Sequence, residues 1–151
     1  MAEQLHHWIG GKRVEGTSGR FGDVFNPATG EVIGKLPYAS KADMDEAVKV
    51  AQEAAEIWGK TAVPKRAAVL FKFRELLVAN TDKLAELVGR EHGKTIADAK
   101  GEISRGIDVT EFACGIPHLI KGEFNSNIGG EIDLFSIREP IGVVGAITPW
   151  N

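Results

Sequence analysis

Four consecutive residues near the end of the sequence have side chains that could do chemistry: Thr148, Pro149, Trp150 and Asn151. They follow residues 141–147, a nearly continuous apolar run that is typical of a strand buried on both faces of a parallel sheet. Ligands of such sheets bind beyond the carboxyl ends of the strands. At that place the Asn151 carboxamide could donate an N–H to a developing oxyanion, and Trp150 could form a flat apolar wall. On these four residues alone, an ordinary turn at the end of a strand is the simpler interpretation.

Arg105 and Cys114 are further candidates, and both lie on a helix that we expect to begin after Thr95 and to end at Pro117. Arg105 falls beside the apolar stripe of this helix, so its guanidinium is free to face a cleft. The alternative is a solvated arginine or a partner for a glutamate. Cys114 is the only cysteine and falls on the buried face, where a free cysteine commonly packs as a small hydrophobe. We therefore expect Cys114 to be a core residue and not a nucleophile.

Patterns that bind phosphate or metal are incomplete in this sequence. Gly93-Lys94-Thr95 lacks the glycine that a phosphate-binding loop needs five positions earlier, where Val88 stands, and no Gly-x-Gly-x-x-Gly occurs. We interpret Gly93 as the stop of one helix and Thr95 as the cap of the next. The four histidines show no metal-ligand spacing, so we predict no metal site.

The elements that must position these residues are hairpins, then helices, then strands. Hairpins are predicted over residues 8–14 and 24–36, around a Gly-Gly turn and an Asn-Pro-Ala-Thr-Gly turn. Helix start signals follow at Ser40 with Asp43, at Pro64, at Thr81 and at Thr95. The alternating residues 131–138 and the apolar run 141–147 predict two strands. The fold class is therefore α/β.

Apolar residues at three- and four-residue spacing mark the faces that these helices should bury. In the first helix they are Met44, Ala47, Val48, Ala51, Ala55 and Trp58. In the second they are Val69, Leu70, Phe73, Leu76 and Leu77.

Composition narrows the class of protein. The chain has 151 residues, 18 Lys+Arg against 21 Asp+Glu and 43% apolar residues, which suits one globular domain and argues against a nucleic-acid scaffold. No apolar run approaches the roughly 20 residues of a membrane-spanning helix. The polar start resembles no secretory signal. We expect a cytoplasmic protein, and a chain that reaches its first central strand only at its end is expected to be a fragment of something longer.

The ordered set of motifs resembles the N-terminal third of the NAD(P)-dependent aldehyde dehydrogenases over nearly all of the chain. The set comprises Trp8-Ile9-Gly10-Gly11, residues 25–32, Glu91-His92-Gly93-Lys94-Thr95, Asp98-Ala99 with Glu102-Ile103, and residues 138–144 leading into 148–151. Within that family the chain is most similar to the CoA-acylating methylmalonate-semialdehyde dehydrogenase branch, on residues 7–12, 15–20 and 102–113. The resemblance implies the N-terminal part of the NAD-binding domain, with β-hairpins, a helical segment and the start of a parallel Rossmann-like sheet over residues 1–151.

The resemblance also implies an activity, which is NAD-dependent oxidation of methylmalonate or malonate semialdehyde with CoA to propionyl-CoA or acetyl-CoA plus CO₂, in valine and inositol catabolism. Asn151 would donate to the oxyanion. The cofactor cleft would be lined by Ile147, Thr148, Pro149 and Trp150. Arg105 would bind the substrate carboxylate, for which the paired donors of an arginine are suited.

Three expectations about the wider protein follow from the resemblance. The nucleophilic cysteine, the general base and the rest of the catalytic domain would lie outside this chain, so residues 1–151 alone should be inactive. Strands at about 131–138 would help to build a homotetramer or dimer. Two alternatives remain, namely a non-acylating aldehyde or semialdehyde dehydrogenase and a non-catalytic oligomerisation module.

Overall fold

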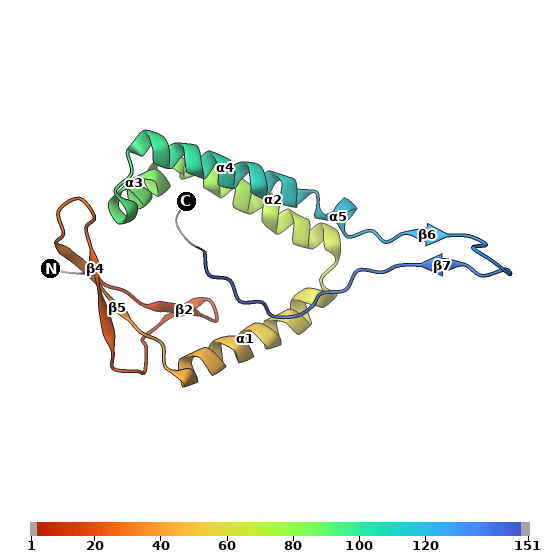
Figure 1. Cartoon of the computed structure of the whole chain (residues 1–151), viewed down its shortest axis with the longest axis horizontal. Coiled ribbons are helices and arrows are strands. Elements are labelled where there is room, and N and C mark those ends of the chain that lie inside the picture. Colours follow the sequence, from red (N-terminus) through yellow and green to blue (C-terminus); the bar gives the residue numbers. More distant parts are fainter. Residues whose placement is uncertain (1–2, 149–151) are drawn as a thin grey trace.

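The computed structural model describes residues 3–148, in which strands come first, helices follow, and a hairpin and an extended segment close the chain (Figure 1). The strands are β1 (Glu3–Gln4), β2 (His7–Ile9), β3 (Lys12–Val14), β4 (Phe21–Phe25), β5 (Val32–Pro37), β6 (Phe124–Asn125) and β7 (Leu134–Phe135). The helices are α1 (Lys41–Lys60), α2 (Val63–Ala79), α3 (Thr81–His92), α4 (Ile96–Cys114) and α5 (Ile116–Leu119).

Both predicted hairpins are confirmed, and turn chemistry explains them. Antiparallel β2 and β3 are joined by Gly10 and Gly11 at φ 61° and 74°, the left-handed conformations that a tight two-residue hairpin turn requires. In the β4–β5 turn, Asn26 Oδ1 accepts a hydrogen bond from the backbone N–H of Ala28, and Gly30 has φ 75°. β1 adds to β5 in parallel, which gives a three-stranded sheet of order β1-β5-β4.

The helix start signals and the Gly93 stop act at or within one residue of the predicted positions, whereas α4 ends at Cys114, three residues before the predicted stop, and Pro117 lies in the first turn of α5. Ser40 and Asp43 form a capping box at α1, and Pro64 lies in the first turn of α2. The α3 cap was predicted one residue late, because Asn80 is the cap and the Thr81 hydroxyl instead donates to carbonyls of the preceding helix. Gly93 ends α3 at φ 83°, as predicted. Thr95 caps α4, as predicted, by accepting from the Asp98 backbone N–H.

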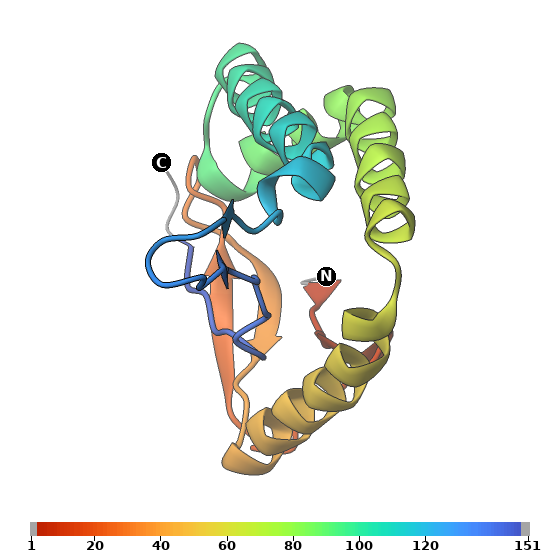
Figure 2. The ribbon, with the colours of Figure 1, turned by 90° about the vertical axis from the view of Figure 1, so that its right-hand side faces the viewer.

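The helices form two separate groups. α2 and α3 both pack against α4, whereas α1 lies on the opposite side of the molecule with the N-terminal strands (Figures 1 and 2). Among residues 3–148, no helix combines the length and apolarity that crossing a bilayer would need.

The core that these elements enclose is small. Its buried apolar residues are Ala67, Ala85, Ala99 and Cys114, so Cys114 is confirmed as a core residue. The buried stripes predicted for α1 and α2 are both wrong, since Met44 is 59% exposed and Phe73 and Leu76 are each 49% exposed. Periodicity identifies an apolar face but not the neighbour that covers it, and the described neighbours of α2 leave this face open.

The two strands predicted near the end of the chain are corrected by the structure. Within residues 131–138, only Leu134–Phe135 is a strand, paired with β6. Residues 141–148 form neither strand nor helix and are exposed, and Gly142 has φ 105°, which interrupts an extended conformation. A strand needs hydrogen-bonding neighbours, and none of the strands within residues 3–148 pairs with this segment. The prediction of a strand buried on both faces is therefore wrong for this structure.

Candidate functional site

Arg105 is an exposed cation on α4. It lies midway along α4, away from the half-buried Ile103 and Ile107 that mark the inner face, as its position beside the apolar stripe predicted. Its side chain is 87% exposed, and its Nη1 is 3.8 Å from Asp108 Oδ2, which is the outer limit of an ion pair. Its forked N–H groups therefore remain accessible to a carboxylate.

A second ion pair lies beside Arg105 and was not predicted from the sequence. Lys94 Nζ, in the linker between α3 and α4, pairs with Glu102 Oε1. The two side chains are 19% and 27% exposed, which makes this pair the least exposed ion pair among residues 3–148. The partners are eight positions apart in the sequence, a spacing that no helix rule describes, because Lys94 precedes the helix that carries Glu102.

The residues expected to line a cofactor cleft are only partly described. Ile147 is fully exposed, and Thr148 is exposed as well. Both side chains are therefore accessible. Pro149, Trp150 and Asn151 lie outside the described residues, so the cofactor contacts and the oxyanion donor predicted there stay predictions.

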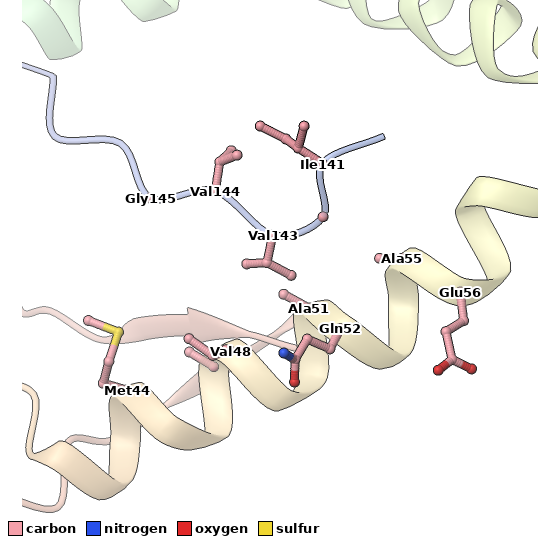
Figure 3. A pocket seen from close by; sticks show the side chains of 12 residues that line it. Met44, Val48, Ala51, Gln52, Ala55, Glu56, Ile141, Val143, Val144 and Gly145 are labelled. Atoms are coloured by element: carbon pink, nitrogen blue, oxygen red, sulfur yellow. The ribbon is translucent and has the colours of Figure 1, made fainter. Parts of the chain in front are cut away.

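An apolar groove of about 870 Å³ lies between α1 and the segment 141–145. Figure 3 shows Val143 pointing toward Ala51 of α1, whereas Ile141 and Val144 point away from the helix. The predicted apolar face of α1 lines one wall, together with Gln52 and Glu56. The described residues of its lining include no cationic side chain, so the groove suits apolar contact and not the binding of a charged phosphate.

Asp43 holds the N-terminal strands against α1. Its carboxylate accepts hydrogen bonds from the Ser40 backbone N–H at 2.8 Å, from the Thr17 backbone N–H at 3.0 Å and from the Thr17 hydroxyl at 2.9 Å. These donors, Ser40 first, lower the pKa of Asp43 well below its ordinary value. The sequence predicted the Ser40 contact, but Thr17 lies 26 residues away and left no local signal.

The remaining chemistry-bearing residues of the described part of the chain gather into no metal site. Among residues 3–148, no three His, Cys, Asp or Glu side chains lie close enough together to hold a metal ion. The Cys114 thiol is buried in the core, which suits packing and not attack on a substrate.

Comparison with characterised sequences points to one family. The model of the aldehyde dehydrogenase family matches residues 14–151. Malonate-semialdehyde dehydrogenase from Halalkalibacterium halodurans is 50% identical over 99% of this chain, and the enzyme of that name from Pseudomonas aeruginosa is 46% identical over 97%. The chain spans 31% and 29% of the lengths of these two relatives.

Solved structures agree with that match. A Sinorhizobium meliloti protein named as a methylmalonate-semialdehyde dehydrogenase, in complex with NAD, is 54% identical, with a TM-score of 0.90 over 94% of this chain and 29% of its own. Methylmalonate-semialdehyde dehydrogenase from Oceanimonas doudoroffii is 43% identical, with a TM-score of 0.87 over 93% of this chain and 28% of its own. The chain therefore belongs to the aldehyde dehydrogenase family, and its fold is that of the matched part of these enzymes.

Proposed function

We propose that the full-length protein containing this chain is an NAD-dependent, CoA-acylating dehydrogenase of methylmalonate or malonate semialdehyde. It acts in the cytoplasm, in the breakdown of valine or inositol. The observation that carries this proposal is the identity of 43–50% to relatives named malonate-semialdehyde dehydrogenase, over 97–99% of the chain. Exposed Arg105 agrees with it, because both substrates carry a carboxylate that a fixed cation would orient.

Each candidate residue has one role in this proposal. The Arg105 guanidinium binds the substrate carboxylate and so orients the aldehyde. The Asn151 carboxamide donates to the oxyanion that forms when a thiolate attacks the aldehyde carbon. Ile147, Thr148, Pro149 and Trp150 contact the cofactor, and NAD, when bound, accepts the hydride. The nucleophile is a cysteine outside this chain, since the Cys114 thiol is buried in the core.

The β6–β7 hairpin supports the proposal of a homotetramer or dimer. It projects beyond the helices (Figure 1), and its apolar side chains are exposed instead of packed. They are Phe124, Ile128, Ile132, Leu134, Phe135 and Ile137. Exposed apolar side chains concentrated on one projecting element are typical of an interaction surface. This feature is also what favours the second candidate function, a non-catalytic oligomerisation module.

An assay of the full-length protein separates the candidates. With methylmalonate semialdehyde and NAD, we expect NADH formation that depends on CoA, and propionyl-CoA as the product found by mass spectrometry. Free acid in place of the thioester would identify a non-acylating dehydrogenase. A protein that forms oligomers yet reduces no NAD with any semialdehyde would contradict the enzymatic proposal and support the module.

A further inference from the structure

Arg105 has two acidic neighbours one turn away on α4. Asp108 lies three residues later and reaches the guanidinium only at 3.8 Å. Glu102 lies three residues earlier, a spacing at which opposite charges on a helix attract each other. Glu102, however, pairs with Lys94.

The partner of Glu102 decides what Arg105 can bind. A carboxylate that pairs with a guanidinium through two parallel N–H bonds occupies the donors that a ligand carboxylate would use. Lys94 reaches Glu102 from the linker that precedes α4, between the helix stop at Gly93 and the cap at Thr95. The pair is the least exposed one in the described part of the chain, so solvent and salt screen it less than the exposed pairs.

Charge balance leads to the same conclusion. Lys94, Glu102, Arg105 and Asp108 together carry two positive and two negative charges. Without Lys94 the group would be net negative, and it would repel an anionic substrate as well as engage Arg105 internally.

We propose that Lys94 is a positioning residue for substrate specificity: by pairing with Glu102 it keeps that carboxylate off Arg105, and so leaves the Arg105 guanidinium for the carboxylate of the semialdehyde. This inference rests on the proposed function, because it concerns the site that the function assigns to Arg105. Lys94 would not touch the substrate, and its effect would pass through Glu102.

The test is Lys94→Met in the full-length enzyme, assayed with malonate semialdehyde and with neutral propanal. The KM for the semialdehyde should rise about three- to tenfold. Glu102 would then pair with Arg105 on the same helix, and one positive charge near the substrate would be lost. The kcat for the semialdehyde should stay within about twofold, because saturating substrate displaces Glu102 from Arg105, and the KM for propanal should stay within about twofold, because propanal has no carboxylate for Arg105 to bind. Lys94→Arg, which retains the ion pair, should restore the wild-type KM.

A second substitution distinguishes positioning from a structural tether. In Lys94→Met/Glu102→Gln the competing carboxylate is gone, so the KM for the semialdehyde should return toward the wild-type value. Lys100→Met is the matched control, because it removes a different lysine, one on α4 whose Nζ pairs with Asp82 of α3 at 2.6 Å. It should leave the KM for both substrates unchanged. Should Lys94→Met not fold, Lys94→Gln takes its place in both experiments.

Two results would overturn the inference. One is an equal rise in KM for semialdehyde and propanal in the Lys94 variant, and the other is a double variant that remains as impaired as the single one. Arg105→Gln separates this failure from that of the proposed function. If Arg105→Gln selectively weakens semialdehyde binding and Lys94→Met does not, only the role of Lys94 is wrong. If Arg105→Gln has no selective effect, the role assigned to Arg105 fails as well.

Discussion

Two regions of the chain differ in what gives them structure: the linker and helix at residues 93–114, and the final segment at residues 121–148. In the first, Gly93 and Thr95 set the helix ends, the Lys94–Glu102 pair joins linker to helix, and α2 and α3 cover one face. In the second, every residue is exposed, and the strands are two residues each. The caps and the ion pair of the first region form between residues that are close in the sequence. An apolar run, in contrast, is buried only when elements distant in the sequence pack against it. The first region therefore acquires its structure from contacts within this chain, whereas the second leaves its apolar side chains exposed.

The largest effect should come from a charge in the apolar segment. We expect Val144→Asp to destabilise the full-length protein by about 3–5 kcal/mol if residues outside this chain cover the segment 141–147 there, because the new carboxylate would then be buried without a partner. In residues 1–151 alone, where Val144 is 69% exposed, the change should stay within about 0.5 kcal/mol. Urea unfolding of both proteins measures the contrast. Val109→Asp on α4, at the same 69% exposure, is the matched control, and equal effects of the two substitutions in the full-length protein would break the comparison.

Next comes the projecting hairpin. Phe135 is 70% exposed, and if β6 and β7 form an oligomer interface, Phe135→Asp should weaken association by about 2–4 kcal/mol, which is typical of an aromatic hot spot. Sedimentation velocity over a range of protein concentrations would show the shift toward smaller species. Phe112→Asp, an equally exposed phenylalanine on α4, should leave the assembly intact. An unchanged oligomer in the Phe135 variant would remove the hairpin from the interface.

On the binding side of the comparison, Arg105→Gln should lower kcat/KM for malonate semialdehyde about 10- to 100-fold, since a charge-assisted contact to a carboxylate contributes about 1.5–3 kcal/mol. The value for propanal should hardly change. Steady-state kinetics with both aldehydes provide the measurement, with Arg74→Gln as control, because Arg74 pairs with Glu111 on another face of the helices. Equal losses for both aldehydes would show that Arg105 supports the fold and not the specificity.

The smallest effect concerns Asp43 and pH. Because its pKa is lowered in the folded state, its contacts stabilise the fold fully above the ordinary carboxyl pKa of 3.8 and lose that contribution as the pH falls toward the lowered value. Asp43→Asn should therefore reduce stability at pH 7, and the gap to wild type should narrow below about pH 4. Urea unfolding at pH 7 and at pH 3 tests the sign. Asp45→Asn is the matched control at pH 7, where it should change stability little because its ion pair with Lys41 is exposed.

Local signals made most of the first 120 residues predictable. The Gly10-Gly11 turn, the Ser40–Asp43 capping box and the Gly93 stop each depend on residues within four positions of one another. Contacts across the fold escaped prediction for the opposite reason. Thr17 meets Asp43 only because the strands turn back toward α1, and Lys94 meets Glu102 only because of the path of the linker.

By itself, the sequence determined where helices begin and end, which residues form tight turns and which faces are apolar, because these depend on backbone conformation and on nearby hydrogen-bonding side chains. Only the tertiary structure decided which apolar faces are covered and which charges meet. The run at residues 141–147 has the composition of a buried strand but takes a strand's conformation only where neighbours supply hydrogen bonds. The sequence shows that Arg105 is positively charged. In our proposal its guanidinium is available to a substrate carboxylate because Glu102 pairs with Lys94 in the folded chain.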